Sequence, residues 1–358
     1  MPRLKLVTTL ALFILCLLVP ASAQALPRGF FGIAPQTPLG SADFARMRSG
    51  GVETVRLSLP WASIQRSPRS DYDWTGFDAA VSEAARKRIG VLPVLGTSPG
   101  WATGSWRRMP VDGGRARRGW AEFVRAAAER YAPGGEFWAE HGPGTDRPLA
   151  PMPVHAWQIW NEENFFYFVK PVSPGRFARL LAITRPAIRR ADPRAEIVLG
   201  GLFGAPKQRL PHAMDAVDFL DQLYRRGGVK ANFDAVALHP YAADVAELRR
   251  QVEAVRGTMA RHGDRRSGLY ISEMGWGSAY NPKTVAFEVG VQGQARELRA
   301  AYRYLIGNHG RLKLKQVDWF TWKDAPGACS FCDSSGLFRA GAKFRPKPAW
   351  RAFVSFAR

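Results

Sequence analysis

Cysteine is scarce in this sequence, which has three among its 358 residues: Cys16, Cys329 and Cys332. No cluster of histidines accompanies the last two, so the sequence lacks the ligands of a zinc site. A thiol oxidoreductase would carry such a pair in a thioredoxin-like βαβ context, which is also missing. In an oxidising compartment the close spacing of Cys329 and Cys332 predicts a structural disulfide.

Long apolar runs are missing after the first twenty residues. Residues 1–5 carry basic side chains, residues 6–19 are almost entirely apolar, and small residues follow, which together predict a secretory signal peptide over residues 1–23. The apolar run is shorter than the roughly 20 residues that a membrane-spanning helix needs. Leu15 precedes Cys16, where a bacterial lipoprotein signal would carry a small residue. We therefore expect a secreted or extracytoplasmic protein without a stable membrane anchor.

Acidic residues are few, because 30 Asp and Glu stand against 51 Lys and Arg and give a formal net charge of +21. One interpretation is that scattered arginines solvate the helix surfaces; the other is that the chain is attracted to a polyanion such as an acidic polysaccharide. The first is preferred because the arginines are scattered through most of the expected helices. Five arginines after the third expected strand would serve the second: Arg107, Arg108, Arg115, Arg117 and Arg118. Export separates the chain from nucleic acid, so we do not expect that partner. We expect a monomer.

The sequence also lacks internal repeats and low-complexity linkers, so residues 24–358 are expected to form one domain. Eight apolar runs predict buried strands: residues 30–34, 52–59, 91–95, 155–160, 197–201, 233–238, 269–274 and 317–322. Helical patterns separate them, and Ser173 followed by Pro174 is typical of a helix start. This alternation predicts a parallel sheet of the α/β class, and eight strands close it into a (β/α)8 TIM barrel.

Carboxylates stand at the ends of two of these strands. Asn161, Glu162 and Glu163 follow the fourth strand, and Glu273 lies near the end of the seventh. The carboxyl ends of barrel strands form the mouth in which such barrels place their active sites. Two carboxylates brought together there are what glycoside hydrolysis requires. The alternative is that these side chains only cap the next helix or meet solvent.

The motif Trp-Asn-Glu at residues 160–162 and the motif Ile-Ser-Glu at residues 271–273 resemble the clan A glycoside hydrolases, retaining enzymes with a (β/α)8 barrel. The whole run is most similar to families 39 and 5. Gly-Leu-Phe at residues 336–338 and Lys-Pro-Ala-Trp at residues 347–350 are similar to the end of the clan's barrel. The resemblance thus covers roughly residues 30–356.

The resemblance implies roles for individual residues. Glu162 matches the clan's acid/base, and Glu273 matches its nucleophile. Asn161 matches the amide that bonds the sugar 2-hydroxyl, and Arg56 matches the arginine that pairs with the nucleophile. The other matching positions would support the nucleophile or bind sugar: His239, Tyr241, Trp276 and Trp322. For each of these the alternative is a purely structural role. No metal or cofactor is implied, because the carboxylates are committed to the reaction and no histidine cluster remains.

The sequence departs from the clan at two places. Glu163 stands where the clan usually has proline, and it could bind substrate, raise the pKa of Glu162 or be mistaken for it. The third strand is followed by Thr97 and Ser98 without the histidine that many members place there. The prediction is a secreted retaining glycoside hydrolase acting on a polysaccharide or oligosaccharide; the alternative is a catalytically silent barrel that binds envelope polysaccharide. Two facing carboxylates favour chemistry, since binding alone does not need them.

Overall fold

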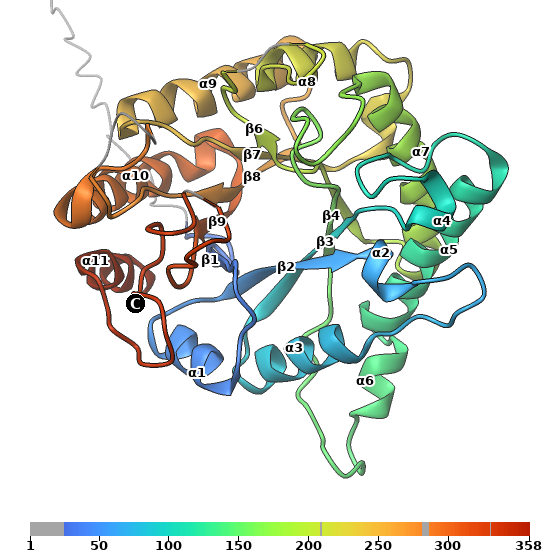
Figure 1. Ribbon diagram of the computed structural model, residues 1–358, viewed down its shortest axis with the longest axis horizontal. Helices are drawn as coiled ribbons and strands as arrows, with labels where there is room; N and C mark the ends of the chain where they lie inside the picture. Colours follow the sequence, from blue (N-terminus) through green and yellow to red (C-terminus); the bar gives the residue numbers. More distant parts are fainter. Residues whose placement is uncertain (1–24, 208–209, 281–285, 330) are drawn as a thin grey trace, which may run out of the picture.

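The computed structural model describes residues 25–207, 210–280, 286–329 and 331–358, so the predicted signal peptide lies outside the described residues. The described chain contains nine strands: β1 (Phe31–Ala34), β2 (Thr54–Pro60), β3 (Gly90–Gly96), β4 (Ala156–Ile159), β5 (Glu196–Val198), β6 (Leu202–Phe203), β7 (Ala235–His239), β8 (Gly268–Met274) and β9 (Leu314–Phe320). They pair in the order β5-β4-β3-β2-β1-β9-β8-β7-β6, and a further pairing of β5 with β7 closes the sheet (Figure 1). All of these pairings are parallel. The predicted barrel is confirmed.

The fifth strand of the barrel is broken into β5 and β6 by Gly200 and Gly201, whereas the sequence predicts one continuous strand there. A Cβ atom on Gly200 would lie 2.3 Å from Oε2 of Glu163, and one on Gly201 would lie 2.2 Å from Nε2 of His239. Gly201 also has a φ of +78°, which favours glycine. The break therefore makes room for two polar side chains beside the fourth and sixth strands of the barrel.

A helix of nine or more residues follows each barrel strand on the outside of the ring (Figure 1). These helices are α1 (Ser41–Ser49), α3 (Thr75–Arg86), α5 (Gly114–Tyr131), α7 (Pro174–Ala191), α8 (Ala216–Tyr224), α9 (Val245–Arg261), α10 (Gly290–Leu312) and α11 (Pro348–Ala357). Short helices lie in the connections: α2 (Trp61–Ile64), α4 (Gly100–Thr103), α6 (Glu136–Glu140) and the 3₁₀ helix η1 (Val229–Asn232). Ser173 caps α7, since its side chain accepts a hydrogen bond from the amide of Arg176.

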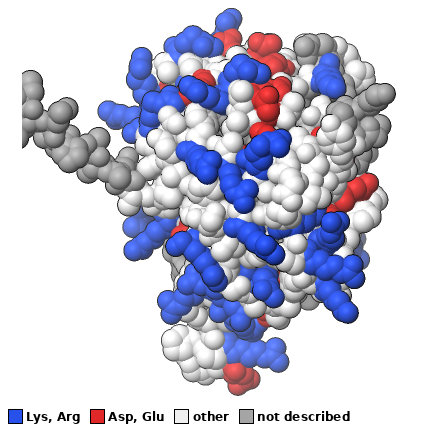
Figure 2. All heavy atoms as spheres, turned by 90° about the vertical axis from the view of Figure 1, so that its left-hand side faces the viewer, with Lys and Arg blue, Asp and Glu red and all other residues white. Residues whose placement is uncertain are grey.

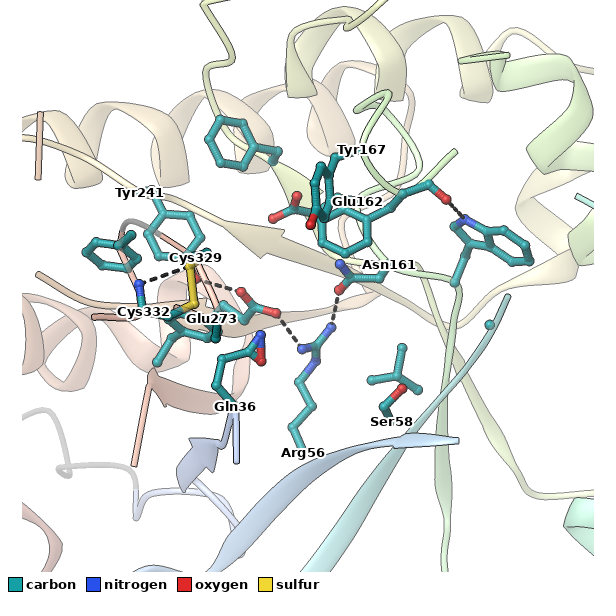
Figure 3. Close-up of a pocket in the computed structure, with 18 of the residues that line it drawn as sticks. Gln36, Arg56, Ser58, Asn161, Glu162, Tyr167, Tyr241, Glu273, Cys329 and Cys332 are labelled. Carbon is teal, nitrogen blue, oxygen red and sulfur yellow. Dashed lines mark hydrogen bonds and ion pairs between the residues drawn. A yellow bond between two sulfur atoms is a disulfide. The ribbon is translucent and has the colours of Figure 1, made fainter. Parts of the chain in front are cut away.

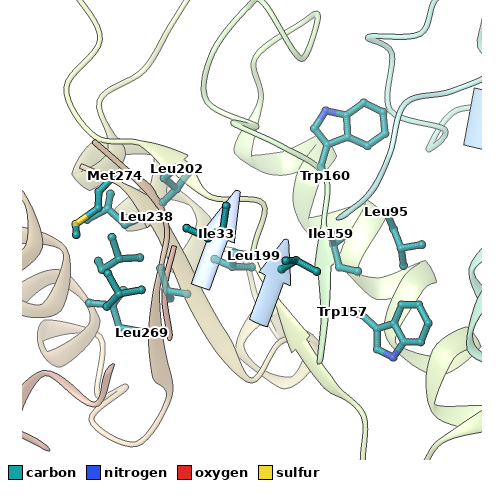
Figure 4. Packing of buried hydrophobic residues seen from close by; sticks show 14 of the residues in the cluster. Ile33, Leu95, Trp157, Ile159, Trp160, Leu199, Leu202, Leu238, Leu269 and Met274 are labelled. Carbon is teal, nitrogen blue, oxygen red and sulfur yellow. The ribbon is translucent and has the colours of Figure 1, made fainter. Parts of the chain in front are cut away.

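Apolar side chains from the strands and helices form one large core and two smaller clusters, and Figure 4 shows part of the packing. Ile33, Leu199 and Leu238 from three different strands are fully buried in the large core. Close packing of this kind gives a rigid scaffold, so the loops at the carboxyl ends of the strands can hold side chains in fixed positions. None of the helices in the described part of the chain combines the length and apolar character that a bilayer span requires.

Basic side chains are numerous on the one face of the molecule that Figure 2 shows. Figure 2 shows the face over α10 and α11, where Lys and Arg are scattered between uncharged residues and Asp and Glu are few. This distribution fits the interpretation that arginines solvate the helices.

Candidate active site

A pocket of about 470 Å³ opens at the carboxyl ends of the barrel strands. Its lining includes Arg56 from β2, Asn161 and Glu162 after β4, Tyr241 after β7 and Glu273 from β8 (Figure 3). This volume lies within the roughly 300–1,000 Å³ range of small-molecule sites. The barrel thus brings together five residues from four distant parts of the sequence, at the place where such barrels carry their active sites.

Glu273 is held by two donors. Nη1 of Arg56 lies 2.5 Å from Oε1 of Glu273, and the Tyr241 hydroxyl donates to Oε2 at 2.6 Å. Arg56 also donates through Nε to Gln158 at 2.7 Å and through Nη2 to Asn161 at 2.6 Å. Both partners of the ion pair are buried, with exposed fractions of 8% for Arg56 and 7% for Glu273. The negative charge of Glu273 is therefore balanced, and its two oxygens are fixed in direction.

Glu162 has the opposite environment. Burial raises its pKa well above the ordinary value, and the charge of Glu273 raises it further, while Arg56 works against both. One oxygen of each carboxyl group and one ring nitrogen of His239 lie within 4.8 Å of one another. The two carboxyl groups of retaining glycosidases are about 5–5.5 Å apart. A protonated and an ionised carboxyl group at this separation can act as acid and nucleophile on one bond.

His239 connects the two carboxyl groups. Its Nδ1 atom lies 2.9 Å from Oε1 of Glu162 and 3.6 Å from Oε2 of Glu273. Its Nε2 atom lies 3.0 Å from the Ser272 hydroxyl, which accepts a hydrogen bond from Gln158 at 3.3 Å. Burial, together with the nearby guanidinium, lowers the pKa of His239 well below its usual value, so the ring is neutral. Because Nδ1 faces two carboxyl groups, we assign its hydrogen there and let Ser272 donate to Nε2.

The backbone is strained where it enters the site. Trp160 and Glu162 have positive φ angles of 72° and 42°, and Thr97 on the neighbouring strand end has a φ of 56°. Residues other than glycine rarely adopt such angles, and they cluster at functional sites. The Trp160 indole donates to the carbonyl of Phe168 at 3.0 Å, and the Glu162 amide donates to the carbonyl of Gly200 at 3.0 Å. These bonds hold Glu162 in the position from which it reaches the pocket.

Glu162, His239 and Glu273 also have the donor atoms of a metal site. Arg56 already neutralises Glu273 at 2.5 Å, and its charge would repel a second cation there. The donor set therefore suits an acid and a nucleophile better than a metal ion.

Two of the residues predicted to contact sugar lie outside the described lining of the pocket. Trp322 is fully buried and donates to Asp43 at 2.8 Å, and Trp276 is 1% exposed; neither lines the pocket. β9 ends at Phe320, so Trp322 lies beyond the strand and packs against Phe338 and Trp350. Phe320 lines the pocket instead. The more exposed aromatic side chains of the lining are Trp106 and Tyr167, with exposed fractions of 45% and 54%. None of these three aromatic residues was predicted as a site residue.

Glu163 points away from the pocket, whose described lining does not include it. It is fully buried, its Oε1 accepts a hydrogen bond from the amide of Gly200 at 3.3 Å, and burial raises its pKa to about 8. Glu163 therefore does not share the pocket with Glu162. Of the three roles considered for Glu163, an influence on the pKa of Glu162 is the one that remains, and it is a minor cause.

Cys329 and Cys332 form the predicted disulfide, and both line the pocket (Figure 3). Gln158 and Ser272 were not predicted as site residues, although each polar side chain interrupts an apolar strand. That interruption is the signal that could have identified them, since a buried polar group needs a partner.

The five arginines after the third strand do not line the pocket. Arg107 is held by its neighbours, because it donates to the carbonyl of Phe166 at 3.4 Å and lies over the ring of Trp106. Arg56, which does line the pocket, is committed to Glu273. Within the described lining, no basic side chain is therefore left to bind an anionic sugar.

Neither a family model nor a curated protein matches this sequence. Solved structures do resemble it. A family 39 glycoside hydrolase from Bacteroides cellulosilyticus WH2 is 19% identical with a TM-score of 0.65, and the match covers 92% of this chain and 64% of that chain. A monomeric β-xylosidase from Caulobacter crescentus CB15 is 18% identical with a TM-score of 0.66, covering 93% and 69%. An endo-β-1,4-glucanase from Xanthomonas axonopodis pv. citri, a triple mutant, is 11% identical with a TM-score of 0.57, covering 92% and 99%.

These structures have the fold of the clan A glycoside hydrolases, and the resemblance predicted from the sequence is confirmed at that level. Of the two families predicted, family 39 is the one that is named among them. This chain spans less than two thirds of the family 39 enzyme from Bacteroides, at 64%, but nearly the whole of the glucanase, at 99%. At sequence identities this low, the structural similarity is evidence for the fold alone. The activity therefore has to be argued from the site.

Proposed function

We propose that this protein is a retaining glycoside hydrolase with Glu162 as acid/base and Glu273 as nucleophile. The observation that carries the proposal is the contrast between the two carboxyl groups. Glu162 is buried with a raised pKa, while Glu273, within 4.8 Å of it, is ion-paired with Arg56. Such a pair supplies a proton and a nucleophile to the same glycosidic bond.

In the first step Glu273 attacks the anomeric carbon, and Glu162 gives its proton to the leaving oxygen. The product is a glycosyl ester of Glu273, which no longer carries a negative charge. The pKa of Glu162 then falls, because one of the causes that raised it was the charge of Glu273. In the second step Glu162 takes a proton from water, the water attacks the anomeric carbon, and Glu273 leaves as a carboxylate.

Asn161 and Tyr241 assist from fixed positions. Oδ1 of Asn161 accepts from Arg56, so its Nδ2 remains to donate to the sugar 2-hydroxyl. Tyr241 donates a hydrogen bond to Oε2 of Glu273. This bond breaks when the ester forms at that oxygen, and it forms again when the ester is hydrolysed. Both contacts restrict the approach of the nucleophile to one direction.

The proposal extends to a monomer of one catalytic domain, residues 24–358, secreted after removal of residues 1–23. The basic, apolar and small-residue pattern of residues 1–23 supports export. The disulfide between Cys329 and Cys332 supports an oxidising compartment. The substrate is a polysaccharide or oligosaccharide outside the cytoplasm.

A panel of aryl glycosides and polysaccharides tests the proposal, with Glu273→Gln as the inactive control. We expect the wild type to hydrolyse at least one glycoside and NMR of the first product to show retained configuration. Glu273→Gln should lower kcat by at least about 10³-fold, because an amide cannot form the glycosyl ester that the carboxylate forms. A wild type that binds polysaccharide but hydrolyses nothing would instead be the silent barrel, and inverted product would assign a different mechanism.

A further inference from the structure

The side of the pocket next to Glu273 is walled by phenylalanines, here called the phenyl wall: Phe203, Phe287, Phe320 and Phe331. Their rings surround Tyr241, with centroid distances of 5.9, 5.7, 6.0 and 5.3 Å in that order. They come from four different parts of the chain, so the barrel and its loops converge to build this surface. Phe203 and Phe287 are only partly buried, and their rings therefore face the pocket.

Hydrogen-bonding groups are sparse beside the phenyl wall. The Tyr241 hydroxyl is committed to Glu273, and the disulfide Cys329–Cys332 adds further apolar surface. Among the described lining residues on this side, Gln36 has a polar side chain that is not hydrogen-bonded to another side chain. Figure 3 places Gln36, Tyr241 and the disulfide around Glu273, with Ser58 on the opposite side of Arg56.

The reaction itself directs the sugar onto this surface. The anomeric carbon must face Glu273, and the leaving group must extend toward Glu162. The rest of the glycone, the sugar that becomes bonded to the nucleophile, then lies beside Glu273 against the phenyl wall. A free hydroxyl pressed against phenyl rings would lose its hydrogen bonds to water and gain none. A methyl group in the same place would be buried favourably.

We infer that the glycone is a neutral sugar that presents a methyl group to the phenyl wall where a common hexose has a hydroxyl, as a 6-deoxyhexose does. A neutral sugar is required because the described pocket lining has no uncommitted basic side chain. The inference rests on the proposed function for the orientation of the sugar. It adds the substrate class, which the two carboxyl groups alone do not define.

The test compares matched pairs of nitrophenyl glycosides, a 6-deoxyhexoside and the hexoside of the same configuration. For the pair that the enzyme accepts, we expect kcat/KM to be about 10- to 100-fold higher for the 6-deoxyhexoside, the range that one group in an apolar pocket supports. Phe287→Asn introduces a hydrogen-bonding group into the wall and should reduce this preference to less than about threefold. Phe287→Leu, the matched control, keeps the wall apolar and should keep the preference.

Hydrolysis of hexosides as fast as or faster than their 6-deoxy counterparts overturns the inference and leaves the proposed function intact. An unchanged ratio in Phe287→Asn, with a melting temperature near that of the wild type, overturns the role of the wall. If no glycoside is hydrolysed, the proposed function fails, and saturation-transfer NMR with the methyl glycosides of the same pairs still decides the substrate class. Equal binding of the two members contradicts it, and tighter binding of the 6-deoxy member supports it.

Discussion

The Nδ1 atom of His239 lies 2.9 Å from Oε1 of Glu162, and burial drives both groups toward their neutral forms. A neutral imidazole can donate its Nδ1 hydrogen to one oxygen of the carboxyl group, so the carboxylic proton resides on the other oxygen. That bond also stabilises the carboxylate once Glu162 has given its proton away. In the proposed mechanism His239 therefore positions Glu162 and does not itself react with substrate.

Replacement of His239 tests this relationship through the pH profile. In His239→Leu the carboxylate of Glu162 loses a donor, so its pKa should rise further. The proposed acid must be protonated, and activity disappears as the pH rises through the pKa of Glu162. The basic limb of kcat/KM should therefore move to higher pH, with kcat lowered about 100-fold by the misplaced acid. His239→Gln, which retains a donor, should move the limb less. Equal basic limbs in all three proteins would show that His239 only fills space.

Arg56 is expected to support both stability and turnover. Arg56→Ala leaves Glu273 buried without its counter-charge and should lower the free energy of unfolding by about 3–5 kcal/mol. Arg56→Lys keeps the charge but loses the donors to Gln158 and Asn161. Relative to Arg56→Ala, it should restore most of the free energy of unfolding but little of kcat. Urea unfolding and steady-state kinetics measure the two effects. Arg125→Ala is the control, because its ion pair with Glu129 is exposed and should contribute less than about 1 kcal/mol. Similar losses in Arg56→Ala and Arg125→Ala would contradict the burial argument.

Glu163 should make stability depend on pH. Its pKa in the folded protein is raised to about 8 from the usual 4.5, so the folded state binds more protons than the unfolded state between these values. The free energy of unfolding must then fall as the pH rises from about 4.5 to about 8. Over this range the unfolded chain has lost the Glu163 proton and the folded protein still holds it, so a higher pH favours unfolding. Glu163→Gln should remove this part of the dependence while leaving kcat at pH 7 nearly unchanged. Urea unfolding at pH 5, 7 and 9 measures it.

The exposed Glu122 on α5 provides the matched control for Glu163. Glu122→Gln should follow the wild-type pH dependence. If Glu163→Gln follows it as well, the buried carboxyl group does not titrate in this range. A large loss of kcat in Glu163→Gln at pH 7 would place Glu163 in the reaction after all.

The sequence predicts the barrel and the central residues for a common physical reason. Apolar runs of strand length mark buried strands, and each of the eight appears with its ends displaced by at most three residues. Because the carboxyl ends of parallel strands meet at one face, residues as distant as Arg56 and Glu273 could be expected to approach each other. The closed sheet brings such residues together although nothing in the sequence next to either residue indicates the contact.

The lining beyond the strand ends was less predictable. The eighth strand of the barrel ends at Phe320, two residues earlier than predicted, so Phe320 lines the pocket and Trp322 already belongs to the following connection. The break at Gly200 depends on Glu163 and His239, which approach from other strands. The phenyl wall depends on the paths of loops, which follow from tertiary packing rather than from periodicity.

The disulfide is expected to stabilise the rim of the pocket. It joins residues three apart in sequence, and loop-closure entropy for so short a loop gives about 2 kcal/mol. Cys329→Ser combined with Cys332→Ser should lower the melting temperature by a few degrees. Activity should also fall, because Phe331 lies between the two cysteines and packs against Tyr241. Thiol labelling of the native wild type with peptide mapping should find Cys329 and Cys332 unlabelled, and labelling of both would refute the bond.

The roles of the three glutamates can be separated by kinetics. Glu273→Ala should abolish turnover on every substrate, because no glycosyl ester forms without the nucleophile. Added azide can then attack from the vacated face and give the inverted glycosyl azide. Glu162→Ala should behave differently with an activated aryl leaving group, which needs little protonation. The first step survives, the second stalls for lack of a base, and azide yields the retained product.

Mass spectrometry of the stalled protein and NMR of the azide products distinguish these outcomes. Glu162→Ala should accumulate a glycosyl adduct on the peptide that contains Glu273, and Glu163→Ala should accumulate none. Glu163 lies outside the pocket lining, so both steps should continue in its absence. Accumulation in Glu163→Ala but not in Glu162→Ala would move the acid by one residue. Unchanged activity in all three variants would show that these carboxyl groups are not the catalytic ones, since loss of either partner of the pair must stop one of the two steps.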